Sequence, residues 1–355
     1  MIQVEEISLT IEHVNPFGLG VANLDSCCYF VPFTLPGEKI LAKPVIKRKN
    51  GTLCELVHVE KPANDRALPQ CRHYQICGGC DLQHAAYEAQ LKLKQHWVCD
   101  LFKSFASTEI RTIIPSPNPY AYRNRITLHN DGKNIGFYRR GSHDIISVTD
   151  CPIASLSLNQ KLDQIVTNSD SLPEILELRE SDSTGFFQIN TAVNELLKKI
   201  VKEMAGGHKS QRILELYAGS GNLSFVLAKT AREIVAVEGN KDAVALAEKE
   251  RLLRALKKVR FECGDAFQIA YRLKQNYETF DTIVCDPPRG GLANVLELIP
   301  AFHASRIIYI SCDPHTLEHD LKFFRQNNFM VKVVQPLDMF PQTHHVELVA
   351  LLEKK

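Results

Sequence analysis

The sequence lacks any stretch of the ~18–20 apolar residues that a transmembrane helix requires. Its first six residues include two acids, where a secretory signal has a basic start followed by an apolar run. It also lacks internal repeats, low-complexity tracts and an excess of charge, because 42 Lys and Arg against 41 Asp and Glu give a net charge of +1. We therefore expect a cytoplasmic, monomeric protein without a membrane partner, in which only local basic patches would hold a nucleic acid.

Cysteine, by contrast, is abundant: 11 of the 355 residues are Cys. Disulfides do not persist in a reducing compartment, so some of these residues are expected to bind metal or to do chemistry. The other proportions, 45% hydrophobic and 23% charged residues, are those of a globular protein of about two or three domains.

The first sixty residues alternate short strand-like runs with Gly, Pro-Gly and Asn-Gly turns. This pattern predicts a five-stranded OB-like barrel, a frequent nucleic-acid platform. Lys43, Lys47, Arg48 and Lys49 cluster before the Asn50-Gly51 hairpin, where a phosphate backbone would fit. A solvated edge that discourages strand pairing is the alternative.

A basic stretch with aromatic residues follows the helix expected over 85–105. Between residues 111 and 143 one acid, Asp131, faces six basic side chains, for a net charge of +5: Arg111, Arg123, Arg125, Lys133, Arg139 and Arg140. Basic and aromatic residues together suit backbone contact and base stacking in RNA, although a half-buried sheet with a charged face has the same composition.

From about residue 186 strand-like and helix-like runs alternate, which predicts a parallel, doubly wound α/β sheet. The expected strands cover 213–217, 233–238, 259–263, 282–285, 307–311 and 331–334, and a final run at 346–352 is expected as an antiparallel edge strand.

A glycine turn, Gly219-Ser220-Gly221, follows the first of these strands and indicates a nucleotide-type ligand at the carboxyl edge of the sheet. Glu238 ends the next strand, where an acid binds ribose hydroxyls. Ser224 stands where dinucleotide enzymes have a third glycine for the pyrophosphate, so S-adenosylmethionine fits better than NAD. A purely structural turn is the alternative.

Asp265 and Asp286 follow the next two strands, and Asp265 is placed to reach an adenine. Asp286-Pro287-Pro288-Arg289 is a stiff tetrad, because each proline fixes its φ. Nucleic-acid amino-methyltransferases have an aromatic residue in place of Arg289, which argues against methylation of an exocyclic amine.

Cys312 lies between an apolar strand and a helix start, where a thiol pKa is lowered, so we expect a reactive thiolate. Uracil explains the need for one: thiolate addition at C6 makes C5 nucleophilic, and a base must then remove the C5 proton. Glu347 is the best candidate base. Packing for the cysteine and a surface position for the acid are the alternatives.

Together these motifs resemble the RNA uridine-5-methyltransferase family, in particular its iron–sulfur bacterial 23S rRNA (uracil-5-)-methyltransferases, over nearly the whole chain. The segment 17–22 is similar to the TRAM domain, an OB-like RNA binder. The spacing Cys71-x5-Cys77-x2-Cys80 is similar to the cluster motif, with Cys151 as fourth ligand, and 186–190 is similar to a segment that reaches the cofactor.

The resemblance implies a Rossmann-like α/β methyltransferase domain, an OB-like TRAM barrel and a central iron–sulfur α+β domain. It implies TRAM over 1–62, the iron–sulfur domain over 63–87 and 111–184, and the methyltransferase domain over 88–110 and 185–355. Cys312 would be the nucleophile and Glu347 the base. The S-adenosylmethionine contacts would be Gln188, Tyr217, Asn222, Glu238, Asp265 and Asp286.

Cys71, Cys77, Cys80 and Cys151 would hold a 4Fe–4S cluster by the same resemblance. Structural zinc is the alternative, but a three-plus-one arrangement is unlike the paired Cys-x2-Cys knuckles of zinc ribbons. Where the family often has Asn, this chain has Asp313, whose charge would raise the pKa of the neighbouring thiol.

The function expected is therefore S-adenosylmethionine-dependent formation of 5-methyluridine in structured RNA, most directly 23S rRNA. A tRNA uridine-5-methyltransferase is the rival, and a non-catalytic iron–sulfur RNA-binding protein is the alternative from another class. A cytosine-5 enzyme fits poorly, because Cys285 precedes Asp286 instead of standing beside the prolines as a second catalytic cysteine.

Overall fold

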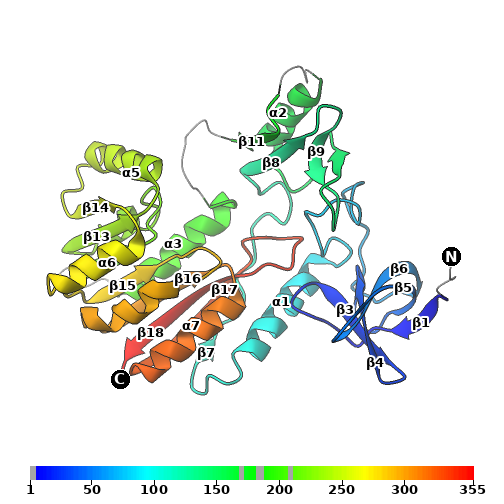
Figure 1. Cartoon of the computed structure of the whole chain (residues 1–355), viewed down its shortest axis with the longest axis horizontal. Helices are drawn as coiled ribbons and strands as arrows, with labels where there is room; N and C mark the ends of the chain where they lie inside the picture. The colour runs from blue at the N-terminus through cyan, green and yellow to red at the C-terminus, as the bar shows by residue number, and fades with distance from the viewer. Residues whose placement is uncertain (1–4, 168–171, 181–187, 207–210) are drawn as a thin grey trace. The chain divides into compact units, whose positions relative to one another are not determined.

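A computed structural model describes residues 5–167, 172–180, 188–206 and 211–355 of the chain. These residues form two compact units (Figure 1). The first unit contains residues 1–97, 118–180 and 340–344, and the second contains 98–117, 181–339 and 345–355. These limits do not coincide with the three domains expected from the sequence, whose boundaries stay a prediction. No helix in the described part of the chain is long and apolar enough to cross a membrane.

The first unit begins with a curled six-stranded sheet, one strand more than the sequence predicted. Its strands lie in the order β1-β5-β6-β4-β3-β2. They are β1 (Ile7–Thr10), β2 (His13–Val14), β3 (Leu19–Leu24), β4 (Cys27–Pro32), β5 (Lys39–Arg48) and β6 (Gly51–Lys61). Alternating apolar residues of these strands form a separate core that includes Leu9, Val31 and Ile40.

The predicted hairpin at Asn50-Gly51 is confirmed, since Arg48 pairs with Gly51 across a two-residue turn. Gly51 has φ +139°, and a Cβ added there would lie 2.6 Å from the backbone oxygen of Cys28. Only glycine fits this close approach of two strands. Lys43, Lys47 and the turn residue Lys49 are all exposed on this hairpin.

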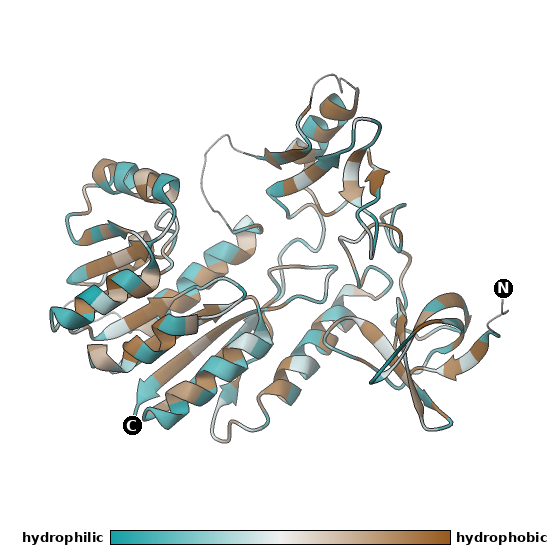
Figure 2. Ribbon diagram, in the orientation of Figure 1, coloured by the Kyte–Doolittle hydropathy of each residue, from teal (hydrophilic) through white to brown (hydrophobic). Residues whose placement is uncertain are grey.

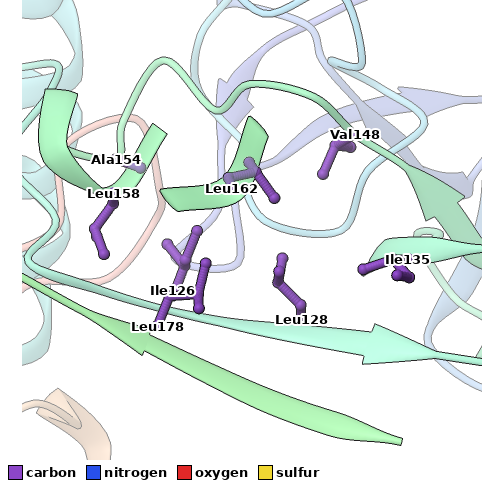
Figure 3. Close-up of a cluster of buried hydrophobic side chains, with 8 residues drawn as sticks. All are labelled: Ile126, Leu128, Ile135, Val148, Ala154, Leu158, Leu162 and Leu178. Atoms are coloured by element: carbon purple, nitrogen blue, oxygen red, sulfur yellow. The ribbon is translucent and has the colours of Figure 1, made fainter. Parts of the chain in front are cut away.

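The first unit also contains a four-stranded antiparallel sheet, in the order β10-β9-β8-β11. Its elements are β8 (Arg125–Asn130), β9 (Ile135–Tyr138), β10 (Ile145–Ser147), β11 (Ile175–Arg179) and the helix α2 (Leu156–Thr167). Leucines of α2 and apolar residues of β8 meet in the core shown in Figure 3, which includes Leu128, Leu158 and Leu162.

The basic side chains predicted to contact RNA are used differently in the structure. Arg123 interacts electrostatically with Cys80 and Cys151, and Arg140 donates a hydrogen bond to Asp81. Arg125 faces Glu177 at 3.8 Å, which leaves Lys133 and Arg139 as the exposed basic residues of this sheet. The half-buried sheet with a charged face therefore describes most of this stretch.

The helix predicted at 85–105 is present as α1 (Tyr87–Leu101).

The second unit is built on an eight-stranded sheet in the order β14-β13-β12-β15-β16-β18-β17-β7. Its strands are β7 (Glu109–Ile110), β12 (Arg212–Leu216), β13 (Glu233–Glu238), β14 (Val259–Cys263), β15 (Thr282–Cys285), β16 (Arg306–Ser311), β17 (Phe329–Leu337) and β18 (Glu347–Lys354).

Five of these strands, β14 to β16 in the sheet order, run parallel, as the alternating sequence pattern predicted. Figure 2 shows mainly hydrophobic residues on the central strands, with hydrophilic residues interspersed along the helices. The helical elements are α3 (Thr191–Ala205), α4 (Ser224–Leu227), α5 (Lys241–Leu253), α6 (Ala266–Gln275), the 3-10 helix η1 (Ala293–Phe302) and α7 (Pro314–Gln326).

The last strand corrects one expectation. β18 is antiparallel, as predicted, but it lies inside the sheet between β16 and β17 and not at the edge. Its sequence explains why, because Leu348, Val349, Ala350 and Leu352 are all fully buried, which suits a central strand. The insertion matters for the site, since it brings the start of β18 beside the end of β16.

Candidate active site

The predicted site residues of the second unit follow neighbouring strands at one edge of the sheet. Asp265 follows β14, Glu238 ends β13, the glycine turn follows β12, Asp286 follows β15 and Cys312 follows β16. Because these five strands are parallel and adjacent, their carboxyl ends share one edge. Ligands of open α/β sheets bind at this edge, so the structure brings the motifs together as a single candidate site.

Glu238 connects two loops of this edge. Its carboxylate accepts hydrogen bonds from the backbone N–H of Gly219 at 2.8 Å and of Asn240 at 2.7 Å. Gly219 has φ +56° and a Cβ added there would meet nothing within 4 Å, so the turn presents bare backbone to open space. Gly221 has φ +87°, and a Cβ there would lie 2.6 Å from the Phe225 ring, which requires glycine.

Asn222 is held by an asparagine that the sequence analysis missed. The side-chain amides of Asn222 and Asn194 exchange two hydrogen bonds, of 2.9 and 3.0 Å. Asn194 lies on α3, which Asn190 caps by accepting from the N–H of Val193. Tyr217 lies just after β12 with φ +63°, and burial raises the pKa of its hydroxyl to about 12. Asp265 caps α6 by accepting from the N–H of Gln268.

Gln188 donates to the Asp286 carboxylate at 3.3 Å and is the described end of the segment 186–190. Phe186 and Phe187, which the sequence analysis placed in the same motif, lie outside the described residues.

Cys312 and Glu347 meet through the pairing of β16 with β18. Ser311, the last residue of β16, pairs with Leu348, so the residues that flank this pair, Cys312 and Glu347, are neighbours. Glu347 is buried, with 2% of its surface exposed, and its charge raises the pKa of the Cys312 thiol. Two residues 35 positions apart in the sequence are thus brought together by a strand pairing.

The expected low thiol pKa is wrong for this structure. Burial, followed by the charges of Glu347 and, less strongly, Asp286, raises the pKa of Cys312 to about 11, against the Arg289 guanidinium and a backbone hydrogen bond, which lower it. Asp313 is not among these causes. Its carboxylate caps α7 by accepting from the N–H groups of His315 and Thr316, which directs its charge at the helix.

The loop that carries Asp286 and Arg289 is fixed to α7. Thr316 donates its hydroxyl proton to the Arg289 carbonyl at 3.0 Å. Buried Asp320 accepts from the Leu292 N–H at 3.1 Å and from the Tyr309 hydroxyl at 2.6 Å. The sequence analysis gave Asp320 no role. The signal available in the sequence was a carboxylate, Asp320, in the helix that directly follows Cys312.

Three carboxyl groups beneath this edge are shifted toward their neutral forms. Burial raises the pKa of Glu347 well above its usual value, and the charge of Asp286 adds to the shift. Burial also raises the pKa of Asp286, against the hydrogen bond from Gln188. Glu215 on β12 was missed from the sequence. Burial raises its pKa to about 8, although the Ser224 hydroxyl donates to it at 2.5 Å.

The four predicted cluster cysteines lie together in the first unit. Electrostatic interactions link Cys71 with Cys77, Cys77 with Cys80, Cys80 with Cys151 and Cys151 with Cys71. All four are free thiols. Burial is the main reason that the pKa of each is raised, to about 12 for Cys80 and about 11 for Cys151.

A buried cation accompanies them. Arg123 interacts electrostatically with Cys80 and Cys151, and its Nε–H is buried without a hydrogen-bond partner in the described part of the chain. Across the same residues, no group of three or more His, Cys, Asp or Glu side chains is arranged to hold a metal ion. The four-cysteine cluster site therefore stays a prediction.

Comparison with known proteins identifies the family of the chain. The sequence model described as tRNA (uracil-5-)-methyltransferase matches residues 172–355, just over half of the chain. The chain belongs to the tRNA (uracil-5-)-methyltransferase family. The predicted enzyme class, an RNA (uracil-5-)-methyltransferase, is thereby confirmed.

Relatives and a solved structure extend the similarity of this RNA (uracil-5-)-methyltransferase to the whole chain. The 23S rRNA (uracil(1939)-C(5))-methyltransferase RlmD of Vibrio parahaemolyticus is 27% identical over 420 residues, covering 98% of this chain and 96% of the relative. An uncharacterised RNA methyltransferase of Listeria innocua is 28% identical, covering 99% and 98%. The crystal structure of Pyrococcus abyssi tRNA (uracil-54, C5)-methyltransferase with S-adenosyl-L-homocysteine has the same fold, with a TM-score of 0.75 at 22% identity, covering 98% of this chain and all of that one.

Proposed function

We propose that this enzyme transfers the methyl group of S-adenosylmethionine to C5 of a uridine in 23S rRNA, through a covalent bond between Cys312 and C6 of the uracil. The observation that carries the proposal is the pairing of Ser311 with Leu348, which makes Cys312 and Glu347 neighbours. A nucleophile and a base are what a C5 substitution on uracil needs.

The chain's own residues account for the chemistry on the uracil. The Cys312 sulfur adds to C6, and the electron pair of the C5–C6 double bond becomes available at C5 for the new bond to carbon. Glu347, as the carboxylate, then takes the proton from C5. The electrons of the broken C5–H bond restore the double bond and expel the Cys312 thiolate. Both side chains must reach the base, which requires the uridine to be flipped from its stack.

S-adenosylmethionine would supply an electrophilic methyl group on a positively charged sulfur. Glu238 would accept from its ribose hydroxyls, Asp265 would accept from its adenine amine, and Tyr217, Asn222, Gln188 and Asp286 would complete its contacts. The site fits this ligand, because the Gly219 turn presents bare backbone and because Asp286 and Glu347 are two buried carboxyl groups that a nearby cation would favour in their ionised form. A cation bound beside these carboxyl groups would lower their pKa values and favour the base form of Glu347.

We propose also that Cys71, Cys77, Cys80 and Cys151 hold a 4Fe–4S cluster in the first unit. Support comes from the closed chain of interactions among the four thiols and from Arg123. Neutral thiols leave the buried Arg123 Nε–H without compensation, whereas four thiolates around iron carry the negative charge that it lacks. The methyl transfer involves no electron transfer, so the role of the cluster would be to shape this unit.

RNA would contact the exposed lysines of the β5–β6 hairpin.

A tRNA uridine is the second candidate substrate. The family description and the Pyrococcus abyssi enzyme both name tRNA, whereas the relatives named RlmD act on 23S rRNA. We favour rRNA because the relatives named RlmD are 27% and 28% identical to this chain, against 22% for the tRNA enzyme.

Tritium release from C5 of labelled uridine distinguishes the two. Anaerobically purified enzyme with S-adenosylmethionine is offered 23S rRNA or tRNA, each transcribed with [5-³H]uridine. We expect release from 23S rRNA that Cys312→Ala abolishes, and 5-methyluridine in the digested product. Release from tRNA alone moves the substrate to the second candidate. Release from neither, with the cofactor bound, contradicts the C5 mechanism.

A further inference from the structure

The connection between β17 and β18 belongs in part to the other unit of the chain. Residues 340–344, which we term the connection segment, pack in the first unit, whereas the residues on either side belong to the second. The segment ends three residues before Glu347. Gln342 in its middle has φ +69°, a left-handed conformation that costs a non-glycine residue about 1 kcal/mol and persists only where surrounding contacts impose it.

The backbone of the connection segment accepts or donates hydrogen bonds with two residues of α1, Gln90 and Lys94, and with Tyr122. Lys94 donates to the Phe340 carbonyl at 3.0 Å, and Tyr122 donates its hydroxyl proton to the Pro341 carbonyl at 3.0 Å. The Gln90 and Gln342 side chains are joined at 3.0 Å, and Gln90 also accepts from the Gln342 N–H. Gln342 is buried, with 1% of its surface exposed.

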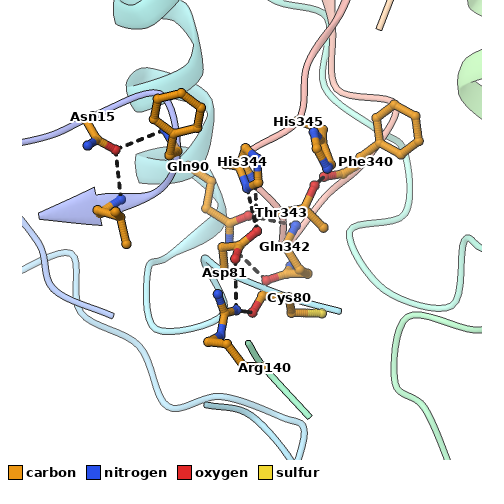
Figure 4. Close-up of polar contacts among 12 residues, drawn as sticks. Asn15, Cys80, Asp81, Gln90, Arg140, Phe340, Gln342, Thr343, His344 and His345 are labelled. Atoms are coloured by element: carbon orange, nitrogen blue, oxygen red, sulfur yellow. Dashed lines mark hydrogen bonds and ion pairs between the residues drawn. The ribbon is translucent and has the colours of Figure 1, made fainter. Parts of the chain in front are cut away.

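The Asp81 side chain binds the end of the connection segment that is nearest to Glu347 in the sequence. Figure 4 shows the Asp81 carboxylate between His344 and Arg140. The His344 Nδ1–H donates to Asp81 at 2.7 Å, and Arg140 donates to Asp81 at 2.9 Å and to the Cys80 carbonyl at 2.6 Å. The backbone N–H of Asp81 and that of Leu82 both donate to the Gln342 carbonyl at 3.0 Å.

We infer that Asp81 is a positioning residue for the reaction: its hydrogen bond to His344 fixes the chain just before β18 and so sets where Glu347 meets the C5 proton. This inference rests on the proposed role of Glu347. Nothing in the sequence pairs Asp81 with His344, which lie 263 positions apart. A carboxylate that is both hydrogen-bonded and charge-compensated holds its partner more firmly than a neutral acceptor does.

The inference predicts a defect confined to one step. If the connection segment loosens, Glu347 moves relative to C5, while Cys312, the glycine turn and Asp286 keep their places on other strands. Addition to C6 and methyl transfer should then proceed, and removal of the C5 proton should slow by about 10–100-fold, as a displacement near 1 Å does. The methylated covalent enzyme–RNA complex should accumulate, because its next step is removal of the C5 proton by Glu347.

The test compares Asp81→Ala and His344→Ala with the wild-type enzyme, using RNA that carries [5-³H]uridine and methyl-labelled S-adenosylmethionine. We expect both variants to lower kcat for tritium release with little change in KM, and to accumulate a denaturation-stable, methyl-labelled protein–RNA complex. His344→Asn, which retains an N–H near the Nδ1 position, should restore most of the rate. The double variant should be no slower than either single variant, since both break one interaction.

Glu38→Gln is the matched control for a loss of stability in the same unit. Glu38 is buried and paired with Arg66 at 2.5 Å, and its hydrogen bonds go to Leu35, Ala63 and Arg66, none of which belongs to the connection segment. Its variant should lower the melting temperature without accumulating the complex. Asp81 variants that slow tritium release and methyl transfer equally, that behave like Glu38→Gln or that match the wild type overturn the inference. If the wild type itself forms no covalent complex, the proposed function is wrong and the inference falls with it.

Discussion

After burial itself, the Glu347 carboxylate is the largest influence on the pKa of the Cys312 thiol, and the Arg289 guanidinium opposes it. Glu347 is the first residue of β18, whereas Arg289 lies in the loop after β15. Burial and the neighbouring carboxyl group therefore both favour the protonated thiol, and a positive charge nearby favours the thiolate.

Substituting Glu347 by a neutral residue should lower the pKa of the Cys312 thiol. Glu347→Gln removes the negative charge, so the pKa of Cys312 should fall below about 11, and Arg289→Met removes the opposing positive charge, so that pKa should rise. The measurement is the rate of iodoacetamide alkylation of the peptide that contains Cys312, followed by mass spectrometry from pH 7 to pH 10 without RNA. Equal profiles for the two variants contradict the assignment of these charges.

Asn194 should support cofactor binding without touching the cofactor. Asn194→Ala removes both partners of the Asn222 amide, which leaves a partly buried polar group unpaired at a cost of about 1–2 kcal/mol, or roughly 5–30-fold in affinity. Calorimetric titration with S-adenosylhomocysteine checks this loss. Lys198→Ala, at an ion-paired surface position of the same helix, should bind like the wild type. An unchanged affinity in Asn194→Ala removes Asn222 from the proposed contacts.

Glu215 should make stability depend on pH. Its pKa is about 8 in the folded chain against 4.5 in the unfolded chain, so between these values the unfolded state releases a proton that the folded state keeps. The wild type should therefore lose stability from pH 5 to pH 8 relative to Glu215→Gln, which has no proton to lose. Urea unfolding at both pH values tests this. A difference between the two proteins that is the same at pH 5 and pH 8 shows that Glu215 is already ionised in the fold.

The cysteine set should behave as a unit in metal binding. Serine in place of Cys71, Cys77, Cys80 or Cys151 should each lower the iron content and the visible absorbance of anaerobically purified protein. Cys54→Ser is the control, because Cys54 is also buried, but in the core of the N-terminal six-stranded sheet. Iron content that survives these substitutions, or zinc in place of iron, contradicts the 4Fe–4S assignment.

Much of the catalytic unit followed from local sequence. Residues directly after buried strands, such as Asp286 and Cys312, could be assigned to one edge because parallel neighbouring strands end together. The Asn50-Gly51 hairpin was equally local. Such features depend on strand periodicity and turn chemistry within a few residues, which a sequence displays directly.

What could not be predicted depends on pairings between distant segments. The insertion of β18 between β16 and β17 decides that Glu347 neighbours Cys312, and although the apolar run of β18 suits a central strand, no local pattern tells between which two strands it lies. The raised thiol pKa has the same origin, because the burial and the two carboxyl groups around Cys312 come from elsewhere in the chain. The half-buried Arg123 was likewise read as a surface charge, because its partners include cysteines from other segments.

The most direct test of the account is trapping of the covalent intermediate on Cys312. RNA transcribed with 5-fluorouridine is incubated with the enzyme and S-adenosylmethionine, and the protein–RNA product is digested and sequenced by mass spectrometry. Fluorine at C5 cannot leave to a base, so elimination is blocked after methyl transfer. We predict a methylated fluorouridine attached to Cys312, and none in Cys312→Ala. Attachment at another residue, or turnover of ordinary RNA without any attachment, would contradict the mechanism.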